Sequence, residues 1–194
     1  MMSFIPKGQK TLTSSGTFIV PYGVTNIIVH LQGAGGGSSF YETHGSDRYS
    51  GGAGGAGGFC TLKIPVAQRQ EISYIVGSGG AGHNIDTNGD AGGQTSFGNY
   101  GIAYGGGGGI AYDNGARGGT GGGVASSSYL IFQSNGATGG NGGKWVANSG
   151  GASYISSGGL SNIGITGNYG KGADTYVGHS GGYTGNPGLI CVIW

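Results

Sequence analysis

Short runs of alternating apolar and polar residues recur along the chain, and long glycine-rich stretches separate them. In residues 25–32, Ile27, Val29 and Leu31 occupy every second position, which puts them on one face of a β-strand. The run at 59–64 and the run at 71–76 are predicted to form a hairpin-like pair around residues 65–70. Together with these, the same pattern predicts strands at residues 17–20, 95–99, 101–104 and 189–194.

The stretches between the strands are dominated by glycine, as residues 51–58 show with the sequence GGAGGAGG. Glycine is a poor helix former and offers no amphipathic stripe, so we expect no α-helix. The regular alternative is the polyproline II conformation, with three residues per turn and a rise of about 3.1 Å per residue. A single glycine tract is usually a flexible linker. Here the tract recurs, so neighbours are present for hydrogen bonding, and we predict an ordered bundle of packed rods. The other tracts lie at residues 33–37, 77–82, 105–109, 115–123, 136–143 and 178–188.

Strands and tracts alternate, and this alternation predicts a molecule with two different ends. If each tract reverses direction where it is interrupted, the β-rich connections gather at one end and the polar and aromatic interruptions at the other. The predicted fold is a single domain over residues 1–194, mainly β and irregular. Its small antiparallel β platform comprises residues 1–32 with 59–76, 94–104 and 189–194. The predicted polyproline II rods with their distal loops comprise residues 33–58, 77–93, 105–123 and 136–188. The interruptions are residues 38–50, 83–88, 110–114, 144–149 and 173–177.

The composition argues against several classes of binding partner. Glycine accounts for 52 of 194 residues, only 8% of the residues are charged and the formal net charge is +1. The scattered basic residues give no phosphate-neutralising patch, so we expect no nucleic-acid partner. No apolar segment approaches the roughly 18 residues of a membrane span, and residues 1–10 lack the core of a signal peptide, so we expect no membrane insertion. Cys60 and Cys191 each lie in a strand-like segment, which favours buried reduced thiols over a disulfide.

The sequence motifs that would indicate a cofactor, metal or catalytic site fail in their context or their spacing. Residues 52–57 fit GxGxxG, but no strand precedes them and a strand instead of a helix follows, so we expect no dinucleotide site. The oxygen-rich stretch that begins at Asp86 lacks the glycine and the glutamate of a calcium loop. His44, with Glu42 and Asp47 close in sequence, is read as a solvated loop cluster. We expect no catalytic residue, no metal, no cofactor and no enzymatic activity.

The chain resembles a known family in three features. The string SGTFIVPYGVTNIIVHLQGAGGG, the interrupted glycine tracts and the closing PGLICVIW are similar to glycine-rich adhesins at the tips of bacteriophage long tail fibres, of the T-even type. Those adhesins carry a longer attachment domain before the first glycine tract, whereas only residues 1–16 precede the first strand here.

The resemblance implies packed polyproline II rods with variable loops that contact a receptor on the host bacterium. The receptor would be an outer-membrane protein or lipopolysaccharide, and a phage tail-fibre shaft protein would be the second partner. The location would be the virion, at the tail-fibre tip, after synthesis in the host cytoplasm. Tyr, Trp and Arg are typical of binding hot spots, which makes the interruptions the candidate receptor-binding surface. The candidate residues are Phe40, Tyr41, His44, Arg48, Tyr49, His83, Asp86, Tyr112, Asp113, Lys144, Trp145 and Tyr176.

Two other functions fit a glycine-rich bundle. An ice-binding protein would present regularly spaced Thr or Ala on a flat face, but Thr is irregular here and the interruptions are long, charged and aromatic. A structural glycine-rich module of a larger surface assembly would show no selective binding to bacterial cells.

Overall fold

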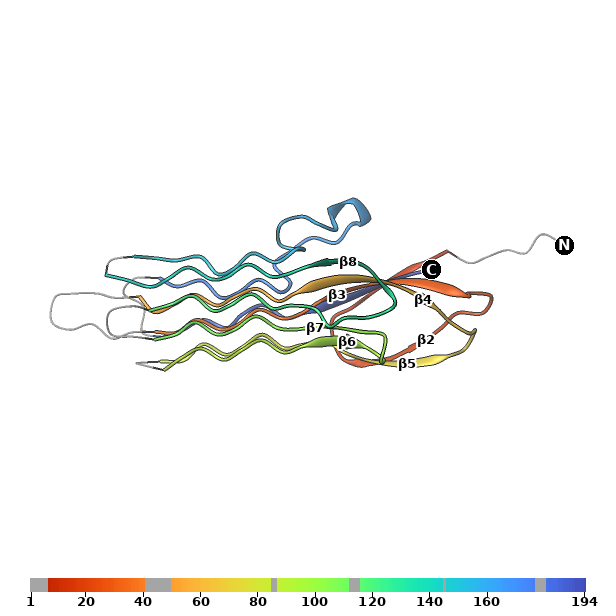
Figure 1. Cartoon of the computed structure of the whole chain (residues 1–194), viewed down its shortest axis with the longest axis horizontal. Helices are drawn as coiled ribbons and strands as arrows, with labels where there is room; N and C mark the ends of the chain where they lie inside the picture. Colours follow the sequence, from red (N-terminus) through yellow and green to blue (C-terminus); the bar gives the residue numbers. More distant parts are fainter. Residues whose placement is uncertain (1–6, 41–49, 85–86, 112–115, 145, 177–180) are drawn as a thin grey trace.

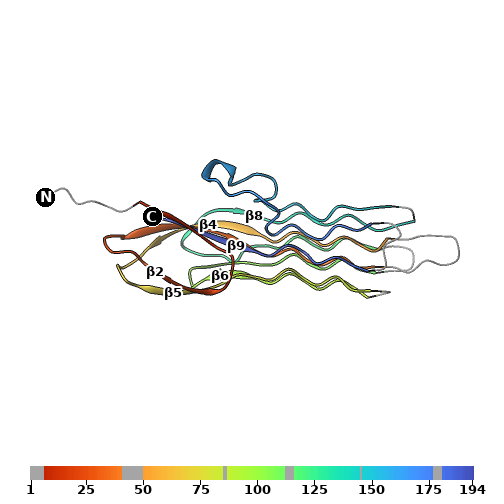
Figure 2. The same cartoon turned by 180° about the vertical axis from the view of Figure 1, so that it is seen from behind.

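The chain forms an elongated molecule with β-sheets at one end and extended glycine-rich tracts running away from them (Figures 1 and 2). The computed structural model describes residues 7–40, 50–84, 87–111, 116–144, 146–176 and 181–194. Within these ranges there is no α-helix, and the one helical element is a short 3-10 helix, Ser161–Ile163. No helix in the described part of the chain is long and apolar enough to cross a membrane.

The larger sheet is antiparallel and has five strands. Their order is β1 (Gln9–Leu12), β9 (Leu189–Ile193), β3 (Asn26–Gln32), β4 (Phe59–Pro65) and β8 (Leu130–Ser134). The strand at 189–193 lies between β1 and β3, so it is an interior strand of the sheet.

The smaller sheet has four strands, in the order β2 (Gly16–Ile19), β5 (Glu71–Ile75), β6 (Thr95–Phe97) and β7 (Gly101–Ala103). The predicted pairing of residues 59–64 with 71–76 is wrong, because β4 and β5 lie in different sheets. β4 pairs along its length with β3, while β5 pairs with β2. The connection between them is held to the β2–β3 turn by three backbone hydrogen bonds, from Val66 to Thr25, from Arg69 to Val20 and from Val20 to Gln70.

The main hydrophobic core lies between the two sheets. Val29, Leu31 and Leu62 from the larger sheet are fully buried against Phe18 and Phe97 from the smaller one. Val29 and Leu31 lie on the alternating face that the sequence predicts.

The two cysteines are buried free thiols on opposite faces of the larger sheet. Cys60 pairs with Leu31 in register and belongs to the main core, whereas Cys191 pairs with His30 on the other face. Burial raises the pKa of Cys60 to about 12 and that of Cys191 to about 11, which keeps both protonated at neutral pH. The expectation of buried reduced thiols is confirmed.

A turn-rich segment at residues 153–169 covers the outer face of the larger sheet; it is the excursion at the top of Figure 1. Its side chains Ile155, Leu160 and Ile165 are buried and pack with Phe59 and Leu189 of the sheet. This segment falls inside the range 136–188 for which rods are expected. It leaves the bundle because its aliphatic residues remove more apolar surface from water against the sheet than an extended glycine tract could.

Two glycine-rich tracts, at residues 33–39 and 50–58, are buried along their whole length and are called the inner tracts here. Successive N–H groups of the tract at 50–58 donate to three different neighbouring tracts in rotation, and the same neighbour returns every third residue. The donors and acceptors are Ala53 to Gly140, Gly54 to Ala173, Gly55 to Gly107, Ala56 to Ala137, Gly57 to Gly170 and Gly58 to Tyr104, at 2.9–3.0 Å.

The tract at 33–39 repeats this pattern. It runs antiparallel to the tract at 50–58 and parallel to the tract at 104–109, and it also contacts the tracts near residues 90 and 186. The hydrogen bonds that define the two directions are Gly33 to Gly58, Gly36 to Gly55 and Ser39 to Gly52 for the antiparallel pair, and Gly106 to Ala34 and Gly109 to Gly37 for the parallel pair. The inner tracts are therefore bonded on all sides through their backbones.

The close approach of these backbones requires glycine. A Cβ atom at Gly54 would overlap the carbonyl oxygen of Gly36, and one at Gly121 would overlap that of Gly136. A Cβ at Gly123, in contrast, would have the Asn135 Oδ1 atom, at 3.9 Å, as its nearest neighbour.

Replacement of Gly54 or Gly121 by Val is expected to lower the free energy of unfolding by about 3 kcal/mol or to prevent folding, because backbone atoms must move apart. The matched control is Gly123→Ala, which has room for its methyl group and is expected to be neutral or slightly stabilising. Thermal and urea unfolding of the three variants measures the effect. Equal melting temperatures for all three would contradict the close backbone packing.

Acid is expected to weaken the fold through His30. Its Nδ1 lies 2.9 Å from the Thr61 hydroxyl, its ring stacks on Phe59, and burial lowers its pKa below 6.5. Between pH 6.5 and the lowered folded pKa, the unfolded chain binds a proton that the folded protein does not, so stability falls as the pH falls. Urea unfolding of wild type and His30→Gln across pH 7.5 to 5 should show a smaller loss in the variant. Parallel pH profiles would refute this role of His30.

Candidate distal binding surface

The end of the bundle opposite the sheets, called the far end here, is formed by the tips of the glycine-rich tracts. The tract at 33–39 starts where β3 ends, and the tract at 50–58 returns to the start of β4, so residue 40 and residue 50 lie far from the sheets. The other tracts follow the same course in Figure 1.

Four of the sequence-predicted candidate residues lie in the described part of the chain. Phe40 and His83 are partly exposed, and Lys144 and Tyr176 are exposed. Each follows or ends a tract that runs toward the far end. The candidates that lie outside the described residues are Tyr41, His44, Arg48, Tyr49, Asp86, Tyr112, Asp113 and Trp145.

The bases of the interruptions are tied to one another. The Ser39 hydroxyl accepts a hydrogen bond from the Gly52 N–H at 2.8 Å, which closes the interruption between the inner tracts at its base. The Asn88 side chain accepts one from the Ala111 N–H at 2.9 Å, and the His83 carbonyl accepts one from Gly182. Segments far apart in the sequence are thereby held side by side at the far end.

The described part of the far end contains one contact between a histidine and a carboxylate, between His83 and Asp90. His83 Nε2 lies 3.0 Å from the Asp90 carboxylate, and both side chains are substantially exposed. No group of three or more His, Cys, Asp or Glu side chains within the described ranges is placed to hold a metal ion. The described part of this end therefore offers a ligand mainly hydrogen-bonding and aromatic groups, and not a strong electrostatic field.

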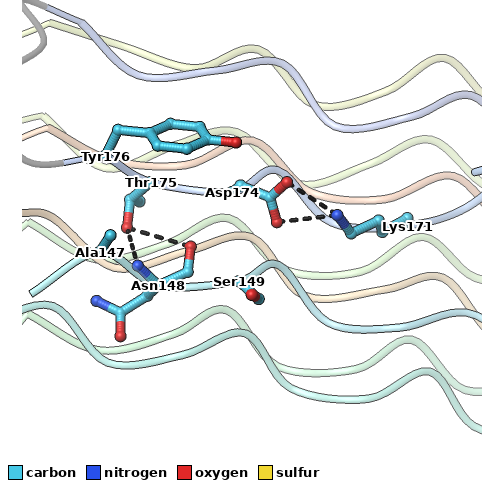
Figure 3. A pocket seen from close by; sticks show the side chains of 7 residues that line it. All are labelled: Ala147, Asn148, Ser149, Lys171, Asp174, Thr175 and Tyr176. Carbon is cyan, nitrogen blue, oxygen red and sulfur yellow. Dashed lines mark hydrogen bonds and ion pairs between the residues drawn. The ribbon is translucent and has the colours of Figure 1, made fainter.

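A shallow pocket of about 170 Å³ lies between the tracts at residues 147–149 and 171–176 (Figure 3). Its floor is fastened by hydrogen bonds from the Asn148 N–H to the backbone oxygen and the hydroxyl of Thr175, both 3.2 Å. The pocket is lined by Ala147, Asn148, Ser149, Lys171, Asp174, Thr175 and Tyr176.

An ion pair forms one side of this pocket. Lys171 Nζ donates to both carboxylate oxygens of Asp174, at 3.0 and 2.8 Å, and the Gly150 N–H donates to Oδ1 of the same carboxylate at 2.8 Å. Figure 3 shows the two side chains reaching toward each other along one tract. Of the lining residues, the sequence-based list contains only Tyr176. The missed signal is the spacing of Lys171 and Asp174, two opposite charges three residues apart that the structure joins in an ion pair.

The outward positions of the tracts carry mixed side chains. In the described tract at 116–123, Arg117 and Thr120 are exposed, and in the tract at 136–143, Thr138 and Asn141 are exposed, followed by Lys144. A flat face of regularly spaced Thr or Ala, as an ice-binding protein requires, is not present on these two tracts.

Comparison with known protein families assigns the chain to one of them. A family model described as a glycine-rich domain matches residues 11–189. The chain belongs to this glycine-rich domain family. No curated protein matches it in sequence. The match covers β2 to β8 in full, the last two residues of β1 and the first residue of β9, so most of both sheets and the bundle lie within one family unit.

Proposed function

We propose that this glycine-rich domain is a receptor-binding adhesin that attaches to a bacterial surface through the far end of its bundle. The observation that carries the proposal is the separation of the two ends. The sheets and their cores lie at one end, and the polar and aromatic interruptions follow tracts that run to the other (Figure 2). The proposed activity is binding and not catalysis, with no cofactor.

The proposed scaffold for this surface is a bundle of polyproline II rods. A polyproline II helix has three residues per turn and no internal hydrogen bonds, so its N–H groups point outward in three directions. The rotation of donors in residues 50–58 among three neighbours is the pattern that such a rod would give. Burial in the tract at 116–123 supports the same period, since Ala116, Gly119 and Gly122 are buried while Arg117 and Thr120 are exposed.

A stiff scaffold suits a binding surface made of several loops. Holding the loop bases in place before binding reduces the conformational entropy that binding would cost. The ties between Ser39 and Gly52 and between Asn88 and Ala111 would serve this purpose at the far end. Tyr176, with 49% of its surface exposed, would supply rigid amphipathic contact area.

The proposed setting is the tip of a bacteriophage long tail fibre, with an outer-membrane protein or lipopolysaccharide as receptor. The fibre shaft protein would then join at the sheet end. In support, Gly8 and Trp194 pair with each other through two backbone hydrogen bonds of 2.8 and 2.9 Å beside β1 and β9, opposite the far end. Attachment at that end would leave the far end pointing outward.

Alanine substitution of an exposed aromatic at each end tests the proposal. Tyr41→Ala, Trp145→Ala and Tyr176→Ala change the proposed receptor surface. Tyr22→Ala is the matched control, because Tyr22 is 75% exposed in the turn before β3, at the sheet end. Binding of the purified protein to outer membranes from a panel of Gram-negative bacteria is expected to weaken by about 1–4 kcal/mol in at least one of the first three. It should remain unchanged in the control.

Two outcomes would contradict the adhesin proposal. One is the absence of binding to any outer membrane of the panel by the wild-type protein. The other is loss of binding in Tyr22→Ala while the far-end variants bind normally, which would place the receptor surface at the sheet end. Circular dichroism and melting temperature confirm that each variant is folded.

A further inference from the structure

The pocket between residues 147–149 and 171–176 has features of a site for one sugar ring. We propose that it binds a single pyranose unit of a neutral glycan, and that this unit is part of the bacterial surface recognised by the adhesin. The second half of this inference rests on the proposed function. The first half rests on the geometry of the pocket alone.

The Lys171–Asp174 ion pair can donate and accept further hydrogen bonds. An ammonium group has three N–H donors, and Lys171 directs two of its contacts to Asp174. On the carboxylate, Oδ1 accepts from both Lys171 and the Gly150 N–H, whereas Oδ2 accepts from Lys171. One N–H of Lys171 and one lone pair of Asp174 Oδ2 therefore remain for a ligand. The two atoms are 2.8 Å apart, so neighbouring groups of one ligand can reach both.

Adjacent ring hydroxyls match this arrangement. A hydroxyl both donates and accepts, so one can donate to Asp174 Oδ2 while its neighbour accepts from Lys171 Nζ. The two charges compensate each other, which removes any preference for an anion or a cation. An apolar ligand would cover the ion pair without replacing its contacts with water, and this desolvation is costly.

Tyr176 supplies the apolar side of the pocket. Its ring makes an edge contact with Tyr183, with centroids 5.5 Å apart and planes at 74°. That contact fixes the ring while leaving about half of the side chain exposed. In Figure 3 the hydroxyl end of Tyr176 points toward the Asp174 side of the pocket. A pyranose ring has a C–H face that can stack on an aromatic ring and hydroxyls at its edge for the polar pair, and the volume of about 170 Å³ suits one ring.

Saturation-transfer NMR and isothermal titration with methyl pyranosides test the site directly. The probes are the methyl glycosides of glucose, galactose, mannose and N-acetylglucosamine. At least one is expected to bind with a Kd on the order of 1 mM, as suits a small ligand in a shallow site. Tyr176→Ala and Lys171→Met should each weaken that binding at least tenfold. Tyr22→Ala, at the opposite end, should leave it unchanged.

Asp174→Asn separates ligand binding from folding. The amide oxygen can still accept from the Gly150 N–H, so the tract is expected to stay folded, while the charged acceptor for the sugar hydroxyl is lost. Weaker sugar binding with an unchanged melting temperature supports the site. The proposal is overturned if no pyranoside binds the wild-type protein, or if Tyr176→Ala and Asp174→Asn both bind as tightly as wild type.

The same proteins, assayed on outer membranes, distinguish the two proposals. Membrane binding without sugar binding refutes the pyranose site and leaves the adhesin proposal standing. Sugar binding without membrane binding supports the site and refutes the adhesin proposal. Competition by free lipopolysaccharide would identify that molecule as the source of the glycan, whereas competition only by membrane protein fractions would contradict a glycan receptor.

Discussion

Hydrogen bonds between the backbones of glycine-rich tracts are the interaction on which the rest of this structure depends. The inner tracts at residues 33–39 and 50–58 have almost no side chains, yet they are buried along their whole length. Their N–H and C=O groups cannot be left unpaired away from water, and neighbouring tracts satisfy them on all sides. Ordering glycine costs more backbone entropy than ordering any other residue, so only a cooperative lattice of such bonds can offset that cost.

The sheets supply what the bundle lacks. Backbone packing of glycine removes little apolar surface from water, so the hydrophobic contribution comes from the core between the sheets and from the segment at 153–169 on the outer face. Every tract that leaves the sheets is anchored there by a strand or by this segment. Both hydrophobic clusters of the described residues therefore lie at the sheets, away from the far end.

The sequence predicts the elements whose packing against other parts of the protein requires a regular pattern of residue types. Apolar and polar residues alternate over 26–32 because one face of β3 packs against the core. The tracts can be recognised in the sequence because their close backbone packing leaves no room for a Cβ atom at most of their glycine positions. The edge strands β1 and β8 were missed, since an edge strand buries few side chains and shows little alternation. The connection at 65–70 looks local, and nothing in it reveals that β5 joins the other sheet. Lys171 is not predicted because it lies inside a glycine-rich stretch, where only its spacing of three residues from Asp174 points to their ion pair.

Amide hydrogen exchange at the inner tracts tests most directly whether backbone hydrogen bonds hold the bundle together as one unit with the sheets. The N–H groups of Gly54, Gly55 and Gly57 are expected to exchange as slowly as those of Val29 and Leu62, because each of the three glycines is buried and bonded to a neighbouring tract. Exchange of these glycines at near-unprotected rates, with the sheets still protected, would contradict this expectation.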